Sequence, residues 1–184
     1  MALAQFSLQA SAGVRYATRL VHDSIVTPFD VQPALAPAVT LTGIAPLQHG
    51  WAAQVALDYT RGSLERHDAD GSTTDIGTVG TLGFTVGLTH RLRSGLLLTF
   101  AAGGVTYLPS DKTGLFRSGS GAIKPSGSVA VARPLPFGAR QHLALELRYD
   151  LHGFTTPALR DEGFTSATAV HRVTLTLRAG GKAP

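Results

Sequence analysis

His22, Asp23 and Ser24 follow one another and supply the three residue types of a hydrolase triad. In such a triad the serine attacks the substrate, the histidine takes its proton and the aspartate orients the histidine. Consecutive residues rarely converge on one reacting atom, because the three side chains need mutual hydrogen-bond geometry. We therefore interpret this segment as part of a solvated loop and predict no catalytic residue.

A second group of side chains has the spacing of a calcium loop. Asp68, Asp70 and Asp75 flank Gly71 and place carboxylate oxygens at intervals that suit a Ca²⁺ ion. The Asp-Gly dipeptide is equally a turn signal, for which a hydrated loop tip is the simpler interpretation. The three aspartates are therefore a calcium candidate, and we predict no other metal and no cofactor.

A third group consists of charged residues that alternate with apolar ones, as Glu146, Arg148 and Asp150 do. Residues two apart point to the same face of a β-strand. If that face is buried its charges must pair, because an unpaired buried charge costs several kcal/mol. We expect these residues to form a salt-bridge plug inside a barrel: Arg15, Asp58, Lys124, Glu146, Arg148, Asp150, His152, Arg172 and Arg178.

Segments with a two-residue period must position these groups. The alternation is plain from Gln5 onward and recurs along the chain. A tilted transmembrane strand needs about 9–11 residues, which these segments provide. The pattern predicts eight strands, over residues 5–17, 35–43, 51–61, 77–90, 95–107, 121–133, 141–152 and 166–178.

Composition narrows the class of protein. Hydrophobic residues make up 43% of the 184 residues and charged residues 15%, well below the roughly 25% charged that is typical of soluble domains. The absence of cysteine excludes disulfides and thiolate metal sites. The net charge is +4, yet the Arg and Lys residues are scattered singly, so we predict no nucleic-acid partner. Residues 1–4, Met-Ala-Leu-Ala, resemble a trimmed signal-peptidase site, which hints at export.

The connections alternate between long and short. Bacterial outer-membrane barrels have long loops outside and tight turns in the periplasm. Nine of the twelve acidic residues fall in the long connections. The long connections are residues 18–34, 62–76, 108–120 and 153–165, and the short ones are 44–50, 91–95 and 134–140.

Aromatic residues gather at both predicted rims. All four tyrosines end strands on the side of the long loops, which predicts an aromatic girdle at one membrane interface. The girdle residues are Tyr16, Tyr59, Tyr107 and Tyr149 at one rim, and Phe6, Trp51 and Phe137 at the other.

The fifth predicted strand contains two adjacent glycines, Gly103 and Gly104. They suggest a β-bulge, after which the side chains of the strand would switch between the two faces of the barrel wall.

A soluble lipocalin-like barrel also alternates, with its apolar face inward. A water-facing set of eight strands should be rich in Lys and Glu, whereas the polar set here is mostly Ser, Thr, Gly, Ala and Gln. That composition favours a narrow closed interior and therefore a transmembrane barrel.

The chain resembles the small eight-stranded outer-membrane barrels of the OmpA/OmpX type, over essentially its whole length and in architecture rather than through a signature motif. The resemblance implies an all-β, antiparallel, up-and-down barrel in the bacterial outer membrane, with long loops extracellular. Such barrels usually end on an aromatic residue, whereas this chain continues past Leu177 to Pro184.

Loops carry recognition on rigid scaffolds. We therefore expect a non-enzymatic protein that presents four loops to lipopolysaccharide or another protein. One alternative is a lipid A-modifying enzyme, since some outer-membrane barrels are deacylases or acyltransferases, but none of the eight predicted strands carries a deacylase-like His-x-Ser motif. A soluble lipid carrier is the other alternative.

Loop boundaries also predict two ion pairs across neighbouring strands. A turn centred near residue 137 places Lys124 opposite Asp150, and a loop centred near residue 159 places Glu146 opposite Arg172. Opposed side chains on adjacent strands lie about 5 Å apart at Cβ, close enough to pair.

Overall fold

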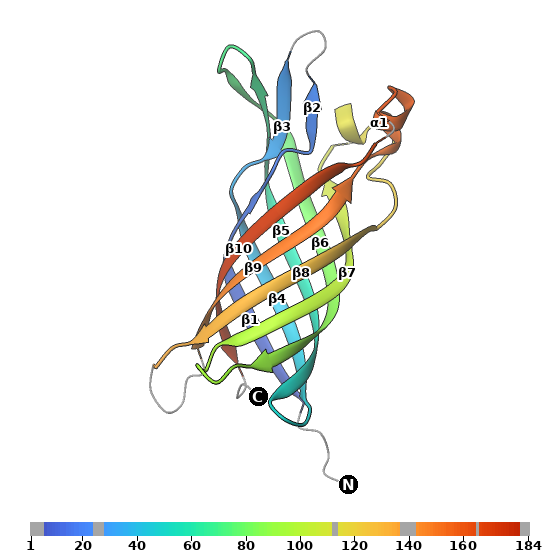
Figure 1. The fold of residues 1–184 in the computed structure, drawn as a ribbon. Coiled ribbons are helices and arrows are strands. Elements are labelled where there is room, and N and C mark those ends of the chain that lie inside the picture. The colour runs from blue at the N-terminus through green and yellow to red at the C-terminus, as the bar shows by residue number, and fades with distance from the viewer. Residues whose placement is uncertain (1–5, 24–27, 112–113, 137–142, 165, 181–184) are drawn as a thin grey trace.

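The computed structural model describes residues 6–23, 28–111, 114–136, 143–164 and 166–180. Eight of the ten described strands form a closed antiparallel ring in which each strand pairs with its neighbours in sequence, and β1 pairs with β10 (Figure 1). The predicted eight-stranded antiparallel barrel is therefore confirmed. The ring consists of β1 (Ser7–Ala17), β4 (Ala36–Pro46), β5 (Trp51–Asp68), β6 (Thr73–Arg91), β7 (Leu97–Pro109), β8 (Lys124–Pro134), β9 (Leu143–Phe154) and β10 (Thr168–Gly180).

Two of the long connections contain strands, which differs from the predicted loops over 18–34 and 62–76. Strands β2 (Val21–Asp23) and β3 (Phe29–Pro33) pair with each other, and β3 also pairs with the far part of β5. Strands β5 and β6 continue beyond the ring, with a bulge between Ser63 and Glu65. The sequence pattern did not predict these extensions of β5 and β6. After the bulge β5 carries four charged or titratable residues in a row, residues 65–68, so the alternation of apolar and polar residues is lost there.

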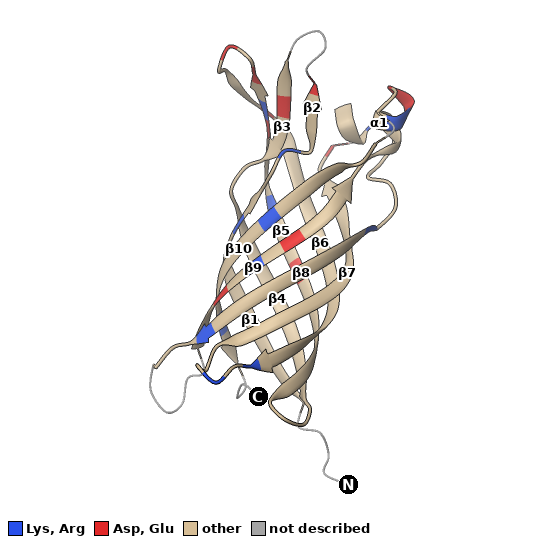
Figure 2. Ribbon diagram, viewed as in Figure 1, with Lys and Arg blue, Asp and Glu red and all other residues tan. Residues whose placement is uncertain are grey.

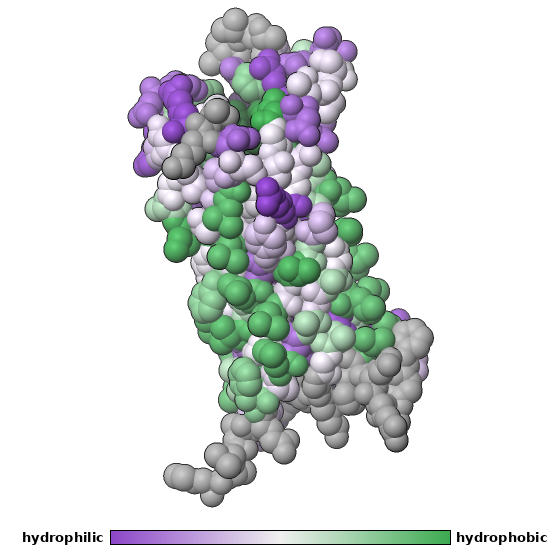
Figure 3. Space-filling view, turned by 180° about the vertical axis from the view of Figure 1, so that it is seen from behind, coloured by the Kyte–Doolittle hydropathy of each residue, from purple (hydrophilic) through white to green (hydrophobic). Residues whose placement is uncertain are grey.

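The strand pleat sorts side chains between the outside and the lumen. Outward leucines, valines and phenylalanines are roughly half exposed, as Phe84 (49%) and Leu147 (54%) are, whereas the inward set is polar or small and buried. Figure 3 shows the apolar residues over the strands and the hydrophilic ones gathered at one end. This is the reverse of a lipocalin-like carrier, whose apolar face lines the interior.

The long connections meet in an apolar cluster that closes the barrel at one end, which we call the loop core. It includes side chains from a short 3₁₀ helix (η1, Gly114–Phe116) and a single helical turn (α1, Pro157–Asp161). Thr156 caps α1, because its side chain accepts a hydrogen bond from the backbone N–H of Leu159 (3.3 Å). The buried members are Ala17, Leu20, Val21, Val31, Leu64, Val79, Tyr107, Phe116, Phe154, Leu159 and Val170.

Strand β7 runs without the bulge expected at Gly103 and Gly104, since its register with β6 is continuous from Pro109 to Leu97. A side chain at Gly103 would collide with the backbone of Phe84 on β6. The glycine therefore allows a close approach of strands. Because the pleat is unbroken, Tyr107 keeps the inward facing of the residues two and ten positions before it.

Among the residues that the structure describes, no helix is long and apolar enough to cross a membrane.

Candidate functional site

The middle of the lumen holds a network of five buried charges on four strands. Arg15 on β1 contacts Asp58 on β5 at 2.5 Å, and both side chains are almost fully buried. The guanidinium of Arg15 also donates to the hydroxyls of Thr174 (2.8 Å) and Thr60 (3.2 Å). One aspartate thus holds an arginine that reaches past β4, the strand between β1 and β5.

The second aspartate of this network, Asp150 on β9, accepts from the Nε and Nη2 atoms of Arg148, each at 2.8 Å. Its other oxygen lies 3.9 Å from Arg172 on β10, and Arg148 lies 4.0 Å from Asp58. Figure 2 shows charges of both signs on neighbouring strands in the middle of the barrel. The five residues, Arg15, Asp58, Arg148, Asp150 and Arg172, therefore form one connected set, which we call the lumen network.

Two further cations lie on the inner face outside this network. Arg178, near the end with the short turns, forms an ion pair with Glu146 and lies 3.4 Å from the side-chain oxygen of Gln9. Lys124, at the other end, donates to the carbonyl oxygens of Ser120 (2.8 Å) and Ala122 (3.0 Å). The structure thus places all nine residues of the expected plug on the inner face, where all nine are buried.

The two ion pairs expected from loop boundaries are wrong, although both faces are right. Asp150 lies opposite Ser128 on β8 and opposite Arg172 on β10. Glu146 lies opposite Thr176 and pairs with Arg178. The two connections are centred on residues 139 and 161, two residues beyond the expected centres, and a shift by two preserves the facing but changes the partner.

Three of the four tyrosines lie on the outer surface at the rim of the long loops: Tyr16, Tyr59 and Tyr149 are 47%, 37% and 37% exposed. Tyr149 also hydrogen-bonds the imidazole of His171 (2.6 Å). Tyr107 lies inside the lumen, 2% exposed, which corrects its assignment to the girdle. Its hydroxyl contacts the Nε2 atom of His152 at 2.7 Å, beneath the loop core.

The opposite rim carries Phe6 and Trp51, which are 66% and 39% exposed. Trp51 packs on the ring of His90 with a centroid separation of 4.4 Å. Phe137 lies outside the described residues.

The structure does not bring the calcium candidates together. Asp68 is held by Arg66 at 2.8 Å, Asp70 accepts from the backbone N–H of Ser72, and Asp75 accepts from that of Gly77. In the described part of the chain no three metal-binding side chains form a group. The hydrogen bonds from Ser72 hold the pKa of Asp70 below its ordinary value.

The triad-like segment lies beyond the ring. His22 on β2 is hydrogen-bonded to Asp30 on β3 (2.6 Å), and Arg19 approaches the same carboxylate at 3.4 Å. Ser24 lies outside the described residues. The histidine thus engages an aspartate that the sequence motif did not include.

A cleft of about 370 Å³ opens at the loop end between the β3–β5–β6 extension and the η1–α1 side. Phe29, Ile76, Leu115 and Leu159 supply its apolar lining. The guanidinium of Arg66 lies over the ring of Phe29, 4.4 Å from its centroid. Sequence reasoning missed this site because its residues come from four separate connections and share no period.

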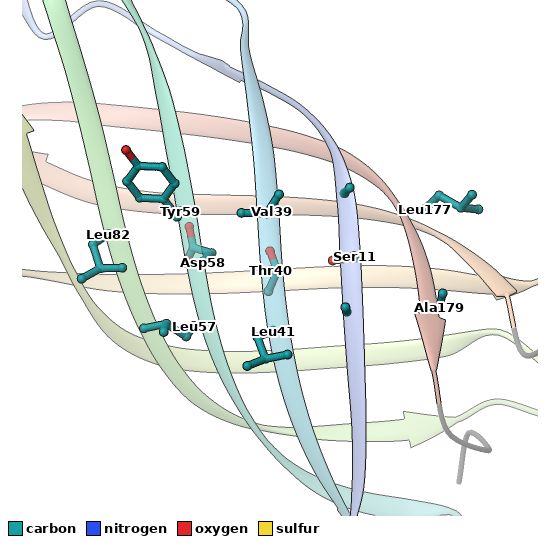
Figure 4. Close-up of a pocket in the computed structure, with 12 residues that line it drawn as sticks. Ser11, Val39, Thr40, Leu41, Leu57, Asp58, Tyr59, Leu82, Leu177 and Ala179 are labelled. Atoms are coloured by element: carbon teal, nitrogen blue, oxygen red, sulfur yellow. The ribbon is translucent and has the colours of Figure 1, made fainter.

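A shallow groove of about 520 Å³ runs along the outer wall over β1 and its neighbours (Figure 4). Ala10 and Ala12 on β1 are small, and the larger side chains of Leu41, Leu57 and Tyr59 rise beside them. The groove therefore belongs to the outward apolar face of the barrel.

No protein-family model matches the chain, and no curated protein matches its sequence. Solved structures do match its fold. The solid-state NMR structure of outer membrane protein AlkL in DMPC bilayers has a TM-score of 0.60 at 14% identity, covering 99% of this chain and 93% of that one.

Two crystal structures match over similar lengths. Neisserial surface protein A has a TM-score of 0.54 at 15% identity, covering 96% of each chain. Ail of Yersinia pestis, solved with the heparin analogue sucrose octasulfate, has a TM-score of 0.55 at 13% identity, covering 96% of this chain and 99% of its own. The fold is that of the small outer-membrane β-barrels. The resemblance noted from the sequence is therefore confirmed in architecture.

Proposed function

We propose that this protein is a non-enzymatic outer-membrane barrel whose loop end binds a surface molecule, either lipopolysaccharide or another protein. The observation that carries the proposal is the cleft of about 370 Å³ over the loop core. Binding clefts of roughly 300–1,000 Å³ are typical for specific ligands. A packed core beneath it gives the cleft a defined shape.

The cleft suits an amphipathic ligand. Phe29, Leu115 and Leu159 offer apolar surface, whereas Arg66 and Glu162 place opposite charges at its edges. Arg66 is oriented by Asp68 and by the ring of Phe29, so its guanidinium is preorganised. Lipopolysaccharide combines acyl chains with anionic groups, and its chemistry matches this mixture.

The outward apolar face supports a barrel that spans the outer membrane, with the loop end extracellular and the short turns periplasmic. Tyr16, Tyr59 and Tyr149 then lie at the outer interface, where amphipathic rings are favoured. Nine acidic residues lie in the long connections on this side. The Ail structure holds a polyanionic sugar, which supports recognition of surface molecules by barrels of this size.

The lumen network supports a pedestal rather than a pore. In an eight-stranded barrel the interior is just wide enough to be filled by side chains. Arg148 on β9 and Asp58 on β5, four strands apart in the ring of eight, approach each other across this interior to 4.0 Å. Planar-bilayer recordings should show no large steady conductance, and such a conductance would overturn the closed barrel.

The binding proposal is tested with the full chain in phosphatidylcholine nanodiscs and purified lipopolysaccharide as the probe. We expect saturable binding that falls at least tenfold in a Phe29→Ala/Leu115→Ala variant. Ile123→Ala is the matched control, because Ile123 is 70% exposed and lies outside the cleft. It should bind like wild type.

Mass spectrometry of lipid A recovered from the same samples should show unchanged acyl composition. Modified lipid A would replace the proposal with the enzyme alternative. Equal binding by wild type and the cleft variant would show that the cleft is not the contact site.

A further inference from the structure

We propose that the lumen holds one small inorganic anion of the halide class between Arg15 and Arg172. The site lies above the two aspartates of the lumen network and below the loop core. It is separate from the proposed recognition cleft and does not depend on it.

The charge of the lumen network is the first observation. Its three arginines face two aspartates, Asp58 and Asp150, through four ion-pair contacts. Arginine does not deprotonate in proteins, so one positive charge is left without a partner. The one other buried acidic residue of the described chain, Glu146, is engaged by Arg178. A buried uncompensated charge costs several kcal/mol, and one monovalent anion balances it.

Unused donors are the second observation. The Nε and Nη1 atoms of Arg172 and the Nη2 atom of Arg15 are buried and have no hydrogen-bond partner within the described residues. Arg172 is 2% exposed, and its nearest carboxylate oxygen, on Asp150, lies 3.9 Å from Nη2. Charged donors in such a site bind an anion more strongly than a neutral guest.

A small cavity beside these donors is the third observation. It has a volume of about 30 Å³ and is lined by Arg15, Arg172, Tyr107, Thr60 and Thr81, together with apolar side chains. One water-sized guest needs roughly 10–15 Å³. The cavity therefore admits a halide but excludes an organic or phosphorylated anion.

The cavity favours an anion over water for a physical reason. Water needs 2–4 polar partners to be held in a buried site. Here the hydroxyls of Thr60 and Thr81 already bond each other at 2.7 Å, and that of Tyr107 bonds His152. The hydrogen-bond partners that remain for a guest in the cavity are the donors of the two guanidinium groups. Water could accept from these donors but would not neutralise the surplus positive charge, whereas an anion does both.

The experiment uses the refolded full chain in detergent, with bromide as the probe. Crystals grown in sodium bromide should show an anomalous peak between the guanidinium groups of Arg15 and Arg172. In solution, stability should rise with bromide relative to sodium gluconate at matched ionic strength. At 100 times the dissociation constant the folded-to-unfolded ratio should increase about 100-fold.

Arg172→Gln removes the surplus charge and should abolish the difference between bromide and gluconate. Arg178→Gln is the matched control, because Arg178 is also a buried lumen arginine but pairs with Glu146 outside the lumen network. It should retain the difference even if it is less stable. If Arg172→Gln does not fold, the presence or absence of the bromide peak in the wild-type crystal tests the proposal on its own. An empty site, water only, or a peak confined to the surface would overturn the proposal.

Discussion

The lumen network and the loop core are both buried, yet they are stabilised in opposite ways. Asp58 and Asp150 are 1% and 0% exposed and are surrounded by guanidinium groups. A few residues further along the same strands, Leu64 and Phe154 are 5% and 1% exposed and pack among apolar side chains. One continuous set of strands therefore builds a polar interior and then an apolar one.

The reason for the difference is what surrounds each region. Within the ring the outer face carries the apolar side chains, so the alternation leaves the polar set to fill the lumen. Beyond the ring the strands and loops face water, and the apolar side chains turn inward as in a soluble domain. The polar lumen gives way to the apolar loop core at Tyr107, which packs against Phe154 and hydrogen-bonds His152.

The largest expected effect comes from breaking the lumen network. Asp58→Asn keeps the shape of the side chain but leaves Arg15 without its carboxylate partner, whereas Arg148 loses only a 4.0 Å contact and keeps Asp150. Removing one partner of a buried ion pair destabilises a protein by about 3–5 kcal/mol. Urea unfolding of the refolded barrel should show a loss of this size.

The control removes both partners. Arg15→Met/Asp58→Leu replaces the pair with apolar side chains, which is often far less destabilising than a single deletion. The double variant should therefore be more stable than Asp58→Asn. A single variant with wild-type stability would show that the lumen charges do not depend on pairing.

Truncation in the loop core should have a smaller effect. Leu159 on α1 is 5% exposed, and Leu159→Ala should reduce the free energy of unfolding by about 2 kcal/mol, the low end for such truncations, because loops can collapse around the gap. Proteolysis in the long connections should become faster. The barrel itself should stay folded, so heated and unheated samples should still migrate differently on a detergent gel. Leu108→Ala, on the outer face and 45% exposed, should leave proteolysis unchanged. Loss of the gel shift in Leu159→Ala would contradict a separate loop core.

The sequence predicted the ring well and the loop core poorly. Alternation identified the inward facing of Arg15, Glu146 and Arg172, because a two-residue period fixes the face of every residue in a strand. It did not identify their partners. Those depend on where each connection is centred, and connections of unequal length give no local signal for it.

The loop core was missed for a different reason. Val31, Phe116 and Leu159 lie in three different long connections, where apolar residues show no two-residue period. Only the tertiary fold brings them together, so no window of sequence contains their pattern. Tyr107 was misplaced because it ends a strand on the side of the long loops, as the other three tyrosines do, and position along a strand does not fix which face a residue occupies. The register of β7 with β6 is continuous, and Tyr107 faces the lumen.

The boundary between the two regions predicts a difference between two tyrosine–histidine pairs. Tyr107→Phe removes the hydroxyl that contacts buried His152 and should cost about 1 kcal/mol, since a buried imidazole loses its partner. Tyr149→Phe removes the equivalent contact with His171 on the exposed outer face and should cost less. Equal effects in urea unfolding would show that burial at Tyr107 contributes nothing.

The smallest expected effect concerns the acidic loop tip, where carboxylates like those of the lumen meet water instead of arginines. The Ser72 hydrogen bonds lower the pKa of Asp70, so the stabilisation they supply is present above the unfolded-state pKa and is lost as pH falls through the lower folded-state value. Because Asp70 is exposed, screening keeps this contribution small. An NMR titration of its carboxyl carbon should give a midpoint below that of an unstructured aspartate.

Calcium tests the same loop independently. Asp68, Asp70 and Asp75 each bind a different group of the protein, so millimolar Ca²⁺ should shift neither the midpoint of Asp70 nor the unfolding curve. A bound divalent ion would lower that midpoint further and raise stability with concentration. Such a response would show that the loop rearranges to gather its carboxylates, and that charge pairing governs the loop tips as it governs the lumen.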